Sequence, residues 1–487
     1  MISREHETEH SMDKIREQLA GLEEISRRLE PDSAVRHDIT QQAADYIDHY
    51  IEGLSTSPAY VQGEFPQLKS LSVSEHGKPF EQLLKILHDE VDHIGISSAS
   101  GKHLGYIPSG GIWSSAVADM LAAAANRYTG IYYSSPGSVI MENQIIKWLC
   151  SLVGYPSGSH GNLTSGGSIA NLIAIKTARD FYKINSDNIK KSVIYFTKHV
   201  HHCIHKALNI TALHEAVHRI IPMDEDFRMD TTALQNTLEA DKRAGLNPFL
   251  VIATAGTTDT GAIDPLDKIA DLCSEYNTWF HIDCAYGGFF ILVDEIKEKF
   301  KGIERSDSLV MDPHKSMFIP YGSGIVLVKN TEALLKSFSH TASYMQDSYD
   351  LDVDEINPTD CSPELTKHAR GLRIWLPLHL HGLEPFRVNL QEKLLLTKYF
   401  HEAIKQIGFE TGPDPQLSIT LFRFPTENVN EFNQKLVDSL HDDGRYFFSS
   451  TEINGELWIR CAVLSFRTHL EEIKQALEMI RENLERI

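Results

Sequence analysis

The feature of this chain that most constrains its fold is a series of apolar runs, each as long as a strand. The clearest runs, rich in β-branched and aromatic residues, span 249–254, 279–283, 308–311 and 325–328. Helical stretches such as 264–276 separate most of them. Strands that alternate with helices are typical of a parallel sheet with helices on both faces. The sequence therefore predicts an α/β protein.

Two of these runs place a charged residue at the carboxyl end of a strand, where ligands of open α/β sheets bind. Asp283 ends one run, and Lys315 closes the motif DPHK (312–315) after another. Apolar and Gly-rich sequence surrounds this motif, so we expect Lys315 to be poorly solvated, with little charge around it. Desolvation lowers the pKa of an ammonium group, and the free amine is a nucleophile toward carbonyls. An ordinary surface lysine is the alternative.

The stretch HIDCAYGG (281–288) and the motif DPHK, with Asp283 and Lys315 32 positions apart, resemble the pyridoxal-phosphate-dependent group II amino acid decarboxylases. This family includes the aromatic-L-amino-acid, tyrosine, glutamate and histidine decarboxylases. The resemblance runs from about Tyr106 to the C-terminus. It implies the fold of aspartate aminotransferase (PLP fold type I), pyridoxal 5′-phosphate as cofactor, and a homodimer with shared active sites.

The resemblance also implies roles for individual residues. Lys315 would hold the cofactor as a Schiff base, and Asp283 would keep the pyridine nitrogen protonated. His201 and the methyl group of Ala285 would lie on the two faces of the ring. The further cofactor contacts that the resemblance implies are Thr258 and His314.

A Gly-rich loop before a helical pattern provides a candidate phosphate site at residues 163–171. Glycines let the backbone approach an anion closely, and Ser168 can cap the helix. Such a loop is weak evidence by itself. Because Asp283 and Lys315 follow it in this order, it resembles the phosphate cradle of the family, with Gly167 and Ser168 at the matching positions.

Four histidines and one cysteine within seven residues, in KHVHHCIHK (198–206), raise the question of a metal site. His201 and His205 have the i, i+4 spacing of a helical metal pair, but no carboxylate or second ligand pair lies nearby in the sequence. We therefore predict no metal. By resemblance, His201 is the histidine that stacks on the cofactor, and the other three are solvated or core residues.

Candidate substrate residues lie in two segments that line the pocket in the family. They are Tyr106, Pro108, Ser109 and Tyr128. Tyr132 and Tyr133 extend the second segment and favour an aromatic substrate, because aromatic pockets prefer aromatic ligands. Arg127 supports the alternative, a pairing with the distal carboxylate of glutamate or aspartate. Core or interface packing is the structural alternative for these tyrosines.

A long polar stretch after Leu335 contains ASYMQ (342–346), and loops of this length inside compact enzymes are usually either functional or disordered. By resemblance, Tyr344 belongs to a loop that closes over the partner's active site. The hydroxyl of this tyrosine would protonate the carbanion left when carbon dioxide departs. A phenol suits this role in a closed, dry site. Tyr349 is a competitor for it.

Two residues depart from the family pattern. Many members have Asn at the position of Asp312, and a carboxylate that approached the phosphate would repel it unless a neighbour compensated. Cys284 replaces a more common Ala, which a small apolar thiol should tolerate.

The rest of the chain predicts the organisation into domains. Residues 1–100 contain two amphipathic helical patterns, before and after Pro31, and form a helical segment. The resemblance implies that this segment embraces the partner of the dimer, and packing on the main body of the same chain is the alternative. Residues 101–375 form the large cofactor-binding domain. Residues 376–487 form a small α+β domain, with strands near 417–424 and 456–463 and a last helix that follows a capping box at 468–471.

Composition narrows the partners and the compartment. A net charge of -21 argues against a surface for nucleic acid or anionic membranes. Six scattered cysteines without a CxxC pair indicate neither a zinc ribbon nor a disulfide framework. The polar N-terminus has no apolar signal core, and no run reaches the length of a membrane span. We therefore expect a cytoplasmic protein that binds small molecules.

These observations predict a carboxy-lyase that converts an L-amino acid, with an aromatic one favoured, to the amine and carbon dioxide. The alternatives are a glutamate- or aspartate-type decarboxylase, and an aldehyde-forming oxidative deaminase or an aminotransferase on the same scaffold. A cofactor-binding protein without turnover is a further alternative. The intact set of chemical residues argues against that last one.

Overall fold

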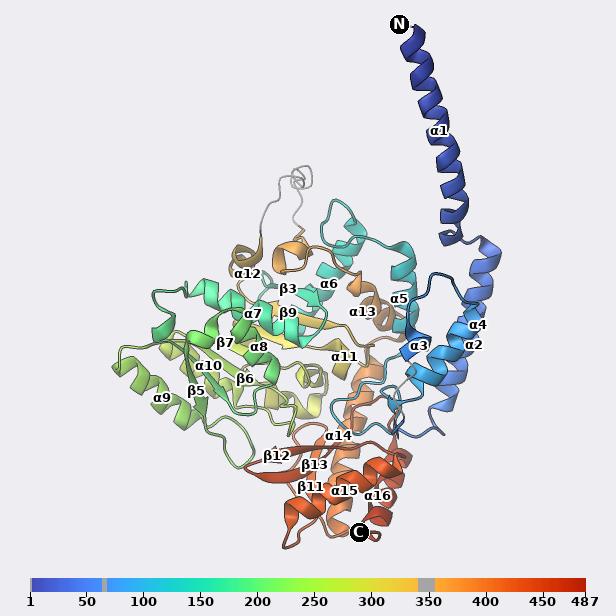
Figure 1. Ribbon diagram of the computed structural model, residues 1–487. Helices are drawn as coiled ribbons and strands as arrows, with labels where there is room; N and C mark the ends of the chain where they lie inside the picture. Colours follow the sequence, from blue (N-terminus) through green and yellow to red (C-terminus); the bar gives the residue numbers. More distant parts are fainter. Residues whose placement is uncertain (1, 64–67, 340–354) are drawn as a thin grey trace. The chain divides into compact units, whose positions relative to one another are not determined.

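The computed structural model describes residues 2–63, 68–339 and 355–487 (Figure 1). The chain divides into two compact units. The first consists of Met1–Ser57 and Val61–Gly95, and the second of Pro58–Tyr60 and Ile96–Ile487. The three domain boundaries expected from the sequence stay predictions.

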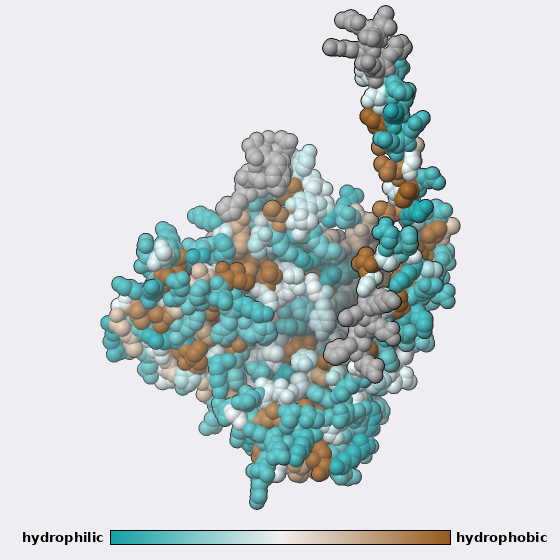
Figure 2. Space-filling model, in the orientation of Figure 1, coloured by the Kyte–Doolittle hydropathy of each residue, from teal (hydrophilic) through white to brown (hydrophobic). Residues whose placement is uncertain are grey.

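The first unit is helical. It contains α1 (Ile2–Ser26), α2 (Ser33–Gly53), α3 (Leu68–Leu71) and α4 (Phe80–Leu87). The two helices expected on either side of Pro31 are thus confirmed. Asp32 caps α2, because its carboxylate accepts the amide of Val35 at 2.9 Å. Figure 2 shows apolar patches along α1. They include the exposed side chains Met12, Ile15, Leu19, Leu22 and Ile25.

A seven-stranded sheet with the order β3-β9-β8-β7-β6-β4-β5 organises the second unit. Its strands are β3 (His160–Thr164), β4 (Ser192–Thr197), β5 (Val217–Ile221), β6 (Asn247–Thr254), β7 (Trp279–Asp283), β8 (Ser308–Met311) and β9 (Gly324–Val328). The pairs from β5 to β8 are parallel, whereas β9 is antiparallel to both of its neighbours. The mostly parallel sheet expected from the sequence is confirmed. The run 325–328 does not join the parallel set, because β9 runs antiparallel to β8 and β3.

Different helices cover the two faces of this sheet (Figure 1). Successive side chains of a strand point to opposite faces. In β4, Val193 and Tyr195 pack in one core, and Ile194 and Phe196 pack in the other. The first core includes residues of α6 (Pro136–Leu152), α9 (Thr231–Arg243) and α10 (Leu266–Tyr276), and the second includes residues of α7 (Gly167–Phe181), α8 (His202–Ile210) and α12 (Thr331–Phe338).

The C-terminal part of the second unit has its own antiparallel sheet with the order β10-β11-β13-β12. Its strands are β10 (Glu410–Thr411), β11 (Ile419–Arg423), β12 (Ser449–Ile453) and β13 (Glu456–Ala462). Its helices are α14 (Glu384–Gln406), α15 (Val429–Asp443) and α16 (Leu470–Leu484). Asn454 and Gly455 both have positive φ, as a two-residue hairpin turn requires.

The capping box of α16 lies one residue later than we expected. His469 is the N-cap and Glu472 completes the box, whereas the sequence suggested Thr468 and Glu471. The Thr468 hydroxyl is engaged elsewhere, because it donates to the carbonyl of Gly101 at 2.6 Å.

The remaining strands and α-helices of the described residues are β1 (Tyr60–Val61), β2 (Gly95–Ile96), α5 (Trp113–Ala125), α11 (Pro313–Ser316) and α13 (Arg370–His381). In the described parts of the chain, no helix is long and apolar enough to cross a membrane.

Candidate active site

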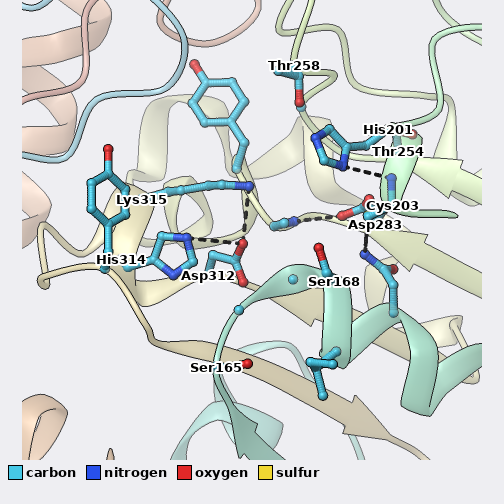
Figure 3. A pocket seen from close by; sticks show the side chains of 18 of the residues that line it. Ser165, Ser168, His201, Cys203, Thr254, Thr258, Asp283, Asp312, His314 and Lys315 are labelled. Atoms are coloured by element: carbon cyan, nitrogen blue, oxygen red, sulfur yellow. Dashed lines mark hydrogen bonds and ion pairs between the residues drawn. The ribbon is translucent and has the colours of Figure 1, made fainter. Parts of the chain in front are cut away.

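A cavity of about 500 Å³ lies at the carboxyl ends of β6, β7 and β8, beside the first turn of α7 (Figure 3). All eight residues that the resemblance assigns to the cofactor line it. They are Gly167, Ser168, His201, Thr258, Asp283, Ala285, His314 and Lys315. Residues that lie up to 148 positions apart in the sequence, from Gly167 to Lys315, therefore meet in one place.

The sheet register explains why Asp283 and Lys315 meet. β7 and β8 are parallel neighbours, with Asp283 opposite Val310. The chain leaves β8 at Met311 and forms the one-turn helix α11, which carries Lys315. Parallel strands deliver their next residues to the same edge of the sheet, so both charged groups reach one cavity.

A chain of buried hydrogen bonds orients Asp283. Its Oδ2 accepts from Nδ2 of Asn171 at 3.3 Å, and its Oδ1 accepts from the amide of Ala285 at 3.2 Å. Asn171 Oδ1 in turn accepts from Nε2 of His281 at 2.8 Å. Asp283 is only 5% exposed and makes no ion pair with a residue of the described ranges. A buried carboxylate of this kind suits a cationic ligand group.

The direction of each bond in this chain follows from its acceptor, Asp283. A carboxylate oxygen accepts, so Asn171 turns its NH₂ group toward Asp283 and its Oδ1 toward His281 Nε2. Oδ1 can only accept, so Nε2 carries a proton. Burial lowers the pKa of His281 to about 4, so the ring is neutral and its Nδ1 is an acceptor. The Ser308 hydroxyl therefore donates to Nδ1 at 2.8 Å, and its oxygen accepts from the indole Nε1 of Trp279, also at 2.8 Å.

Lys315 does not have the environment that the sequence suggested. Its Nζ lies 3.2 Å from Oδ2 of Asp312. Burial disfavours the ammonium form, but Asp312 and Asp283 favour it more strongly, so the pKa of Lys315 is raised above its usual value. The expectation of a lysine with little charge around it and a lowered pKa is therefore wrong, because two carboxylates face it.

His201 is the N-cap residue of α8. Its Nδ1 accepts the amide of Cys203 at 3.3 Å, so a neutral ring carries its proton on Nε2. Burial lowers the pKa of His201, and Lys315 lowers it further, although Asp283 opposes this shift. A neutral imidazole in the cavity wall suits stacking on an aromatic ring.

The first turn of α7 contributes a backbone surface to the cavity. The helix begins at Gly167 with Gly166 as N-cap, so Ser168 lies inside the first turn and does not cap it, contrary to expectation. A side chain at position 167 would clash, because a Cβ atom there would lie 2.8 Å from Asp312 Oδ2. The amides at the start of a helix have no intrahelical acceptor, so this glycine turn can bind an anion.

The other predicted site residues are not part of this cavity wall. They are Tyr106, Pro108, Ser109 and Tyr128. The hydroxyl of Tyr128 donates to the carbonyl of Leu365 at 2.9 Å. Their roles in substrate binding stay predictions. Tyr344 and Tyr349 lie outside the described residues.

One functional candidate, Asn171, escaped the sequence reasoning, and it lines the cavity. Asp312, whose role the sequence left open, lines it too. Asn171 lies four residues after Gly167 on the same helix, and this spacing puts both on one face, which was a usable signal. Among the described residues, no group of three or more His, Cys, Asp or Glu side chains is arranged to hold a metal ion.

The residues present fit pyridoxal phosphate. A lysine can hold the aldehyde, a buried carboxylate that makes no ion pair within the described ranges can face the pyridinium nitrogen, and a glycine turn at a helix start can take the phosphate. Fold and cavity together define a pyridoxal-phosphate enzyme of fold type I. The family model described as the pyridoxal-dependent decarboxylase conserved domain matches residues 63–424. The chain therefore belongs to the pyridoxal-dependent decarboxylases, and the expected family, fold and cofactor are confirmed.

Individual relatives agree with this family. The chain is 32% identical to an aromatic-L-amino-acid decarboxylase of Bacillus atrophaeus, over 94% of this chain and 97% of the relative. It is 28% identical to an L-2,4-diaminobutyrate decarboxylase of Acinetobacter baumannii, over 92% and 94% of the two chains. The crystal structure of Oryza sativa TDC with PLP and tryptamine has the same fold, with a TM-score of 0.87 at 23% identity over 93% and 98% of the two chains.

Proposed function

We propose that this decarboxylase acts on an aromatic L-amino acid and releases the amine and carbon dioxide, with Lys315 and Asp283 as its central catalytic residues. The observation that carries the proposal is the buried carboxylate of Asp283, which faces the same cavity as Lys315. The similarity to the Bacillus atrophaeus enzyme over nearly the whole chain supports an aromatic substrate. The similarity to the Acinetobacter baumannii enzyme makes diaminobutyrate the second candidate.

Each cavity residue has a part in this proposal. When bound, pyridoxal phosphate supplies a ring that accepts the electron pair left by the departing carboxyl group. Lys315 would hold the cofactor covalently once its ammonium group has given up a proton. Asp283, oriented by Asn171, would keep a proton on the ring nitrogen. His201 would lie against the ring as a neutral imidazole.

The phosphate would bind at the first turn of α7. The first-turn amides of Gly167 and Ser168 supply donors and the positive end of the helix dipole. Thr258, Ala285 and His314 would make the further contacts. Exclusion of water from this cavity would strengthen each of these electrostatic contacts.

We also propose a homodimer. The exposed apolar stripe of α1, which includes Ile15, Leu19 and Leu22, supports it, because helices with such a stripe pair with another surface. Sedimentation of the purified protein tests this proposal, and a monomer at micromolar concentration would contradict it. The cytoplasmic location stays a prediction.

Two measurements test the chemistry. Borohydride reduction of the yellow protein should fix the cofactor to the peptide that carries Lys315, and labelling at another lysine would end this assignment. A panel of amino acids then separates the substrate classes. Carbon dioxide and amine should form fastest from tyrosine, tryptophan or their hydroxylated relatives. Faster release from glutamate, aspartate or diaminobutyrate would reverse the proposed class, and aldehyde with ammonia would indicate oxidative deamination.

A further inference from the structure

Asp312 is a buried carboxylate with a specific cationic partner. It is 1% exposed, and its Oδ2 lies 3.2 Å from Nζ of Lys315 and 3.7 Å from Nε2 of His314 (Figure 3). Its Oδ1 is buried and has no hydrogen-bond partner within the described ranges of the chain. Within the described ranges, Oδ1 therefore has no hydrogen-bond donor, and Oδ2 depends on Lys315.

No other permanent cation of the cavity wall can take over this partnership. Lys315 is the only lysine or arginine among the described residues that line the cavity. Burial lowers the pKa of His314, although Asp312 opposes the shift, and His314 already uses Nδ1 on the carbonyl of Ser323. The remaining wall residues near Lys315 include the second carboxylate, Asp283.

Asp312 also cannot turn away. The amide of Asp312 donates to the carbonyl of Ala285 at 3.0 Å, which holds the backbone. On the side of α7, the carboxylate is so close to Gly167 that a Cβ atom there would lie 2.8 Å from Oδ2 and 3.3 Å from Oδ1. The carboxylate is thus fixed beside the position of the lysine amine.

We propose that Asp312 is the counter-ion that stabilises Lys315 in the cofactor-free protein, and that it thereby weakens the affinity of the protein for pyridoxal phosphate. The inference rests on the proposed role of Lys315 as the residue that binds the cofactor. In this inference, Asp312 shifts the binding equilibrium from the loaded protein toward the cofactor-free protein.

The reaction that attaches the cofactor to Lys315, here called loading, explains why Asp312 weakens the affinity. The ammonium group of Lys315 releases a proton, its nitrogen attacks the aldehyde carbon, the carbonyl oxygen leaves as water, and the proton returns to the nitrogen of the new C=N bond. Three N–H donors would thereby become one, and the cofactor's own phenolic oxygen would accept that one. The nitrogen keeps its positive charge, but no N–H is left for Asp312, so its buried carboxylate loses its hydrogen-bond donor. Because leaving a buried charged acceptor without its donor is unfavourable, Asp312 opposes loading.

The Asp312→Asn variant tests this inference through binding rather than activity. Titration of cofactor-free protein should show that Asp312→Asn binds pyridoxal phosphate at least about tenfold more tightly than the original protein. Pyridoxine 5′-phosphate, which has an alcohol in place of the aldehyde and leaves Lys315 an ammonium, should gain less than about twofold. The cofactor-free variant should also melt at a lower temperature, because Lys315 has lost its counter-ion. Asp187→Asn, which removes an exposed carboxylate, is the matched control and should change neither affinity.

Several results would overturn the inference. Unchanged or weaker binding of pyridoxal phosphate by Asp312→Asn would do so. An equal gain for both ligands would show that Asp312 acts on the phosphate and not through Lys315. If Asp312→Asn does not fold, Asp312→Ser gives the same neutral site and the same test. Borohydride labelling of the variant separates the two proposals. Labelling away from Lys315 contradicts the proposed function, whereas labelling at Lys315 with unchanged affinity contradicts only the role of Asp312.

Discussion

Replacing Asn171 by Ala should show how strongly the buried hydrogen-bond chain supports Asp283. Asn171 is fully buried and joins His281, at 2.8 Å, to the carboxylate of Asp283, at 3.3 Å. The variant removes both bonds at once, together with the weak contact of Nδ2 to Cys203 Sγ at 3.5 Å. Among the described residues, it leaves Asp283 with the amide of Ala285 as its remaining donor, and it leaves Nε2–H of His281 unpaired in the core.

The magnitude follows from these two losses. A hydrogen bond to a charged group contributes about 1.5–3 kcal/mol, and a buried donor without a partner costs about 1–3 kcal/mol. The contact to Asp283 is long, so the lower half of the first range applies. We expect Asn171→Ala to lower the free energy of unfolding by about 2.5–5 kcal/mol. Turnover should fall as well, because Asp283 is no longer held in one orientation.

A double-mutant cycle separates this chain from simple loss of packing. His281→Phe removes the donor that Asn171 satisfies, so the double variant should be destabilised by at least about 1 kcal/mol less than the sum of the two single variants. Urea titration of the cofactor-free proteins measures the free energy of unfolding of the original protein, the two single variants and the double variant. Asn209→Ala, an exposed helical asparagine, is the control and should change stability by less than about 0.5 kcal/mol. Additive effects, or a loss below about 1 kcal/mol in Asn171→Ala, would refute the reasoning.

Three further predictions concern turnover, product and pH. Asp283→Ala should still bind the cofactor but turn over at least about a hundredfold more slowly, and near-normal rates would exclude its role. Tyr344→Phe should shift the product from amine to aldehyde, ammonia and peroxide, whereas wild-type amine formation combined with its loss in Tyr349→Phe would identify the other tyrosine. Burial lowers the pKa of three histidines from 6.5 to about 4, namely His103, His160 and His281. Because the unfolded chain binds protons that these folded residues do not, stability should fall between pH 6.5 and 4 by up to about 3 kcal/mol per histidine. A flat urea midpoint over this range would contradict the last prediction.

Sequence reasoning succeeded where a rule of the fold decides the outcome. Asp283 and Lys315 follow neighbouring parallel strands, and such strands deliver their ends to one edge, so their meeting was predictable. It failed where short-range geometry decides. We treated DPHK as the end of a strand, but 313–316 form one helical turn, which brings Asp312 to Lys315 at i, i+3. The lysine pKa is therefore raised instead of lowered.

The sequence by itself determined the family, the cofactor and most of the cavity wall, because residue types and their spacing along strand ends carry that information. Only the tertiary structure decided the charge state and orientation of the groups within it. Trp279, Ser308, His281 and Asn171 lie on three different elements, and their hydrogen bonds form only after β7, β8 and α7 have packed together. Electrostatic interactions depend on distances of a few ångströms and on burial, and neither is a property of sequence separation.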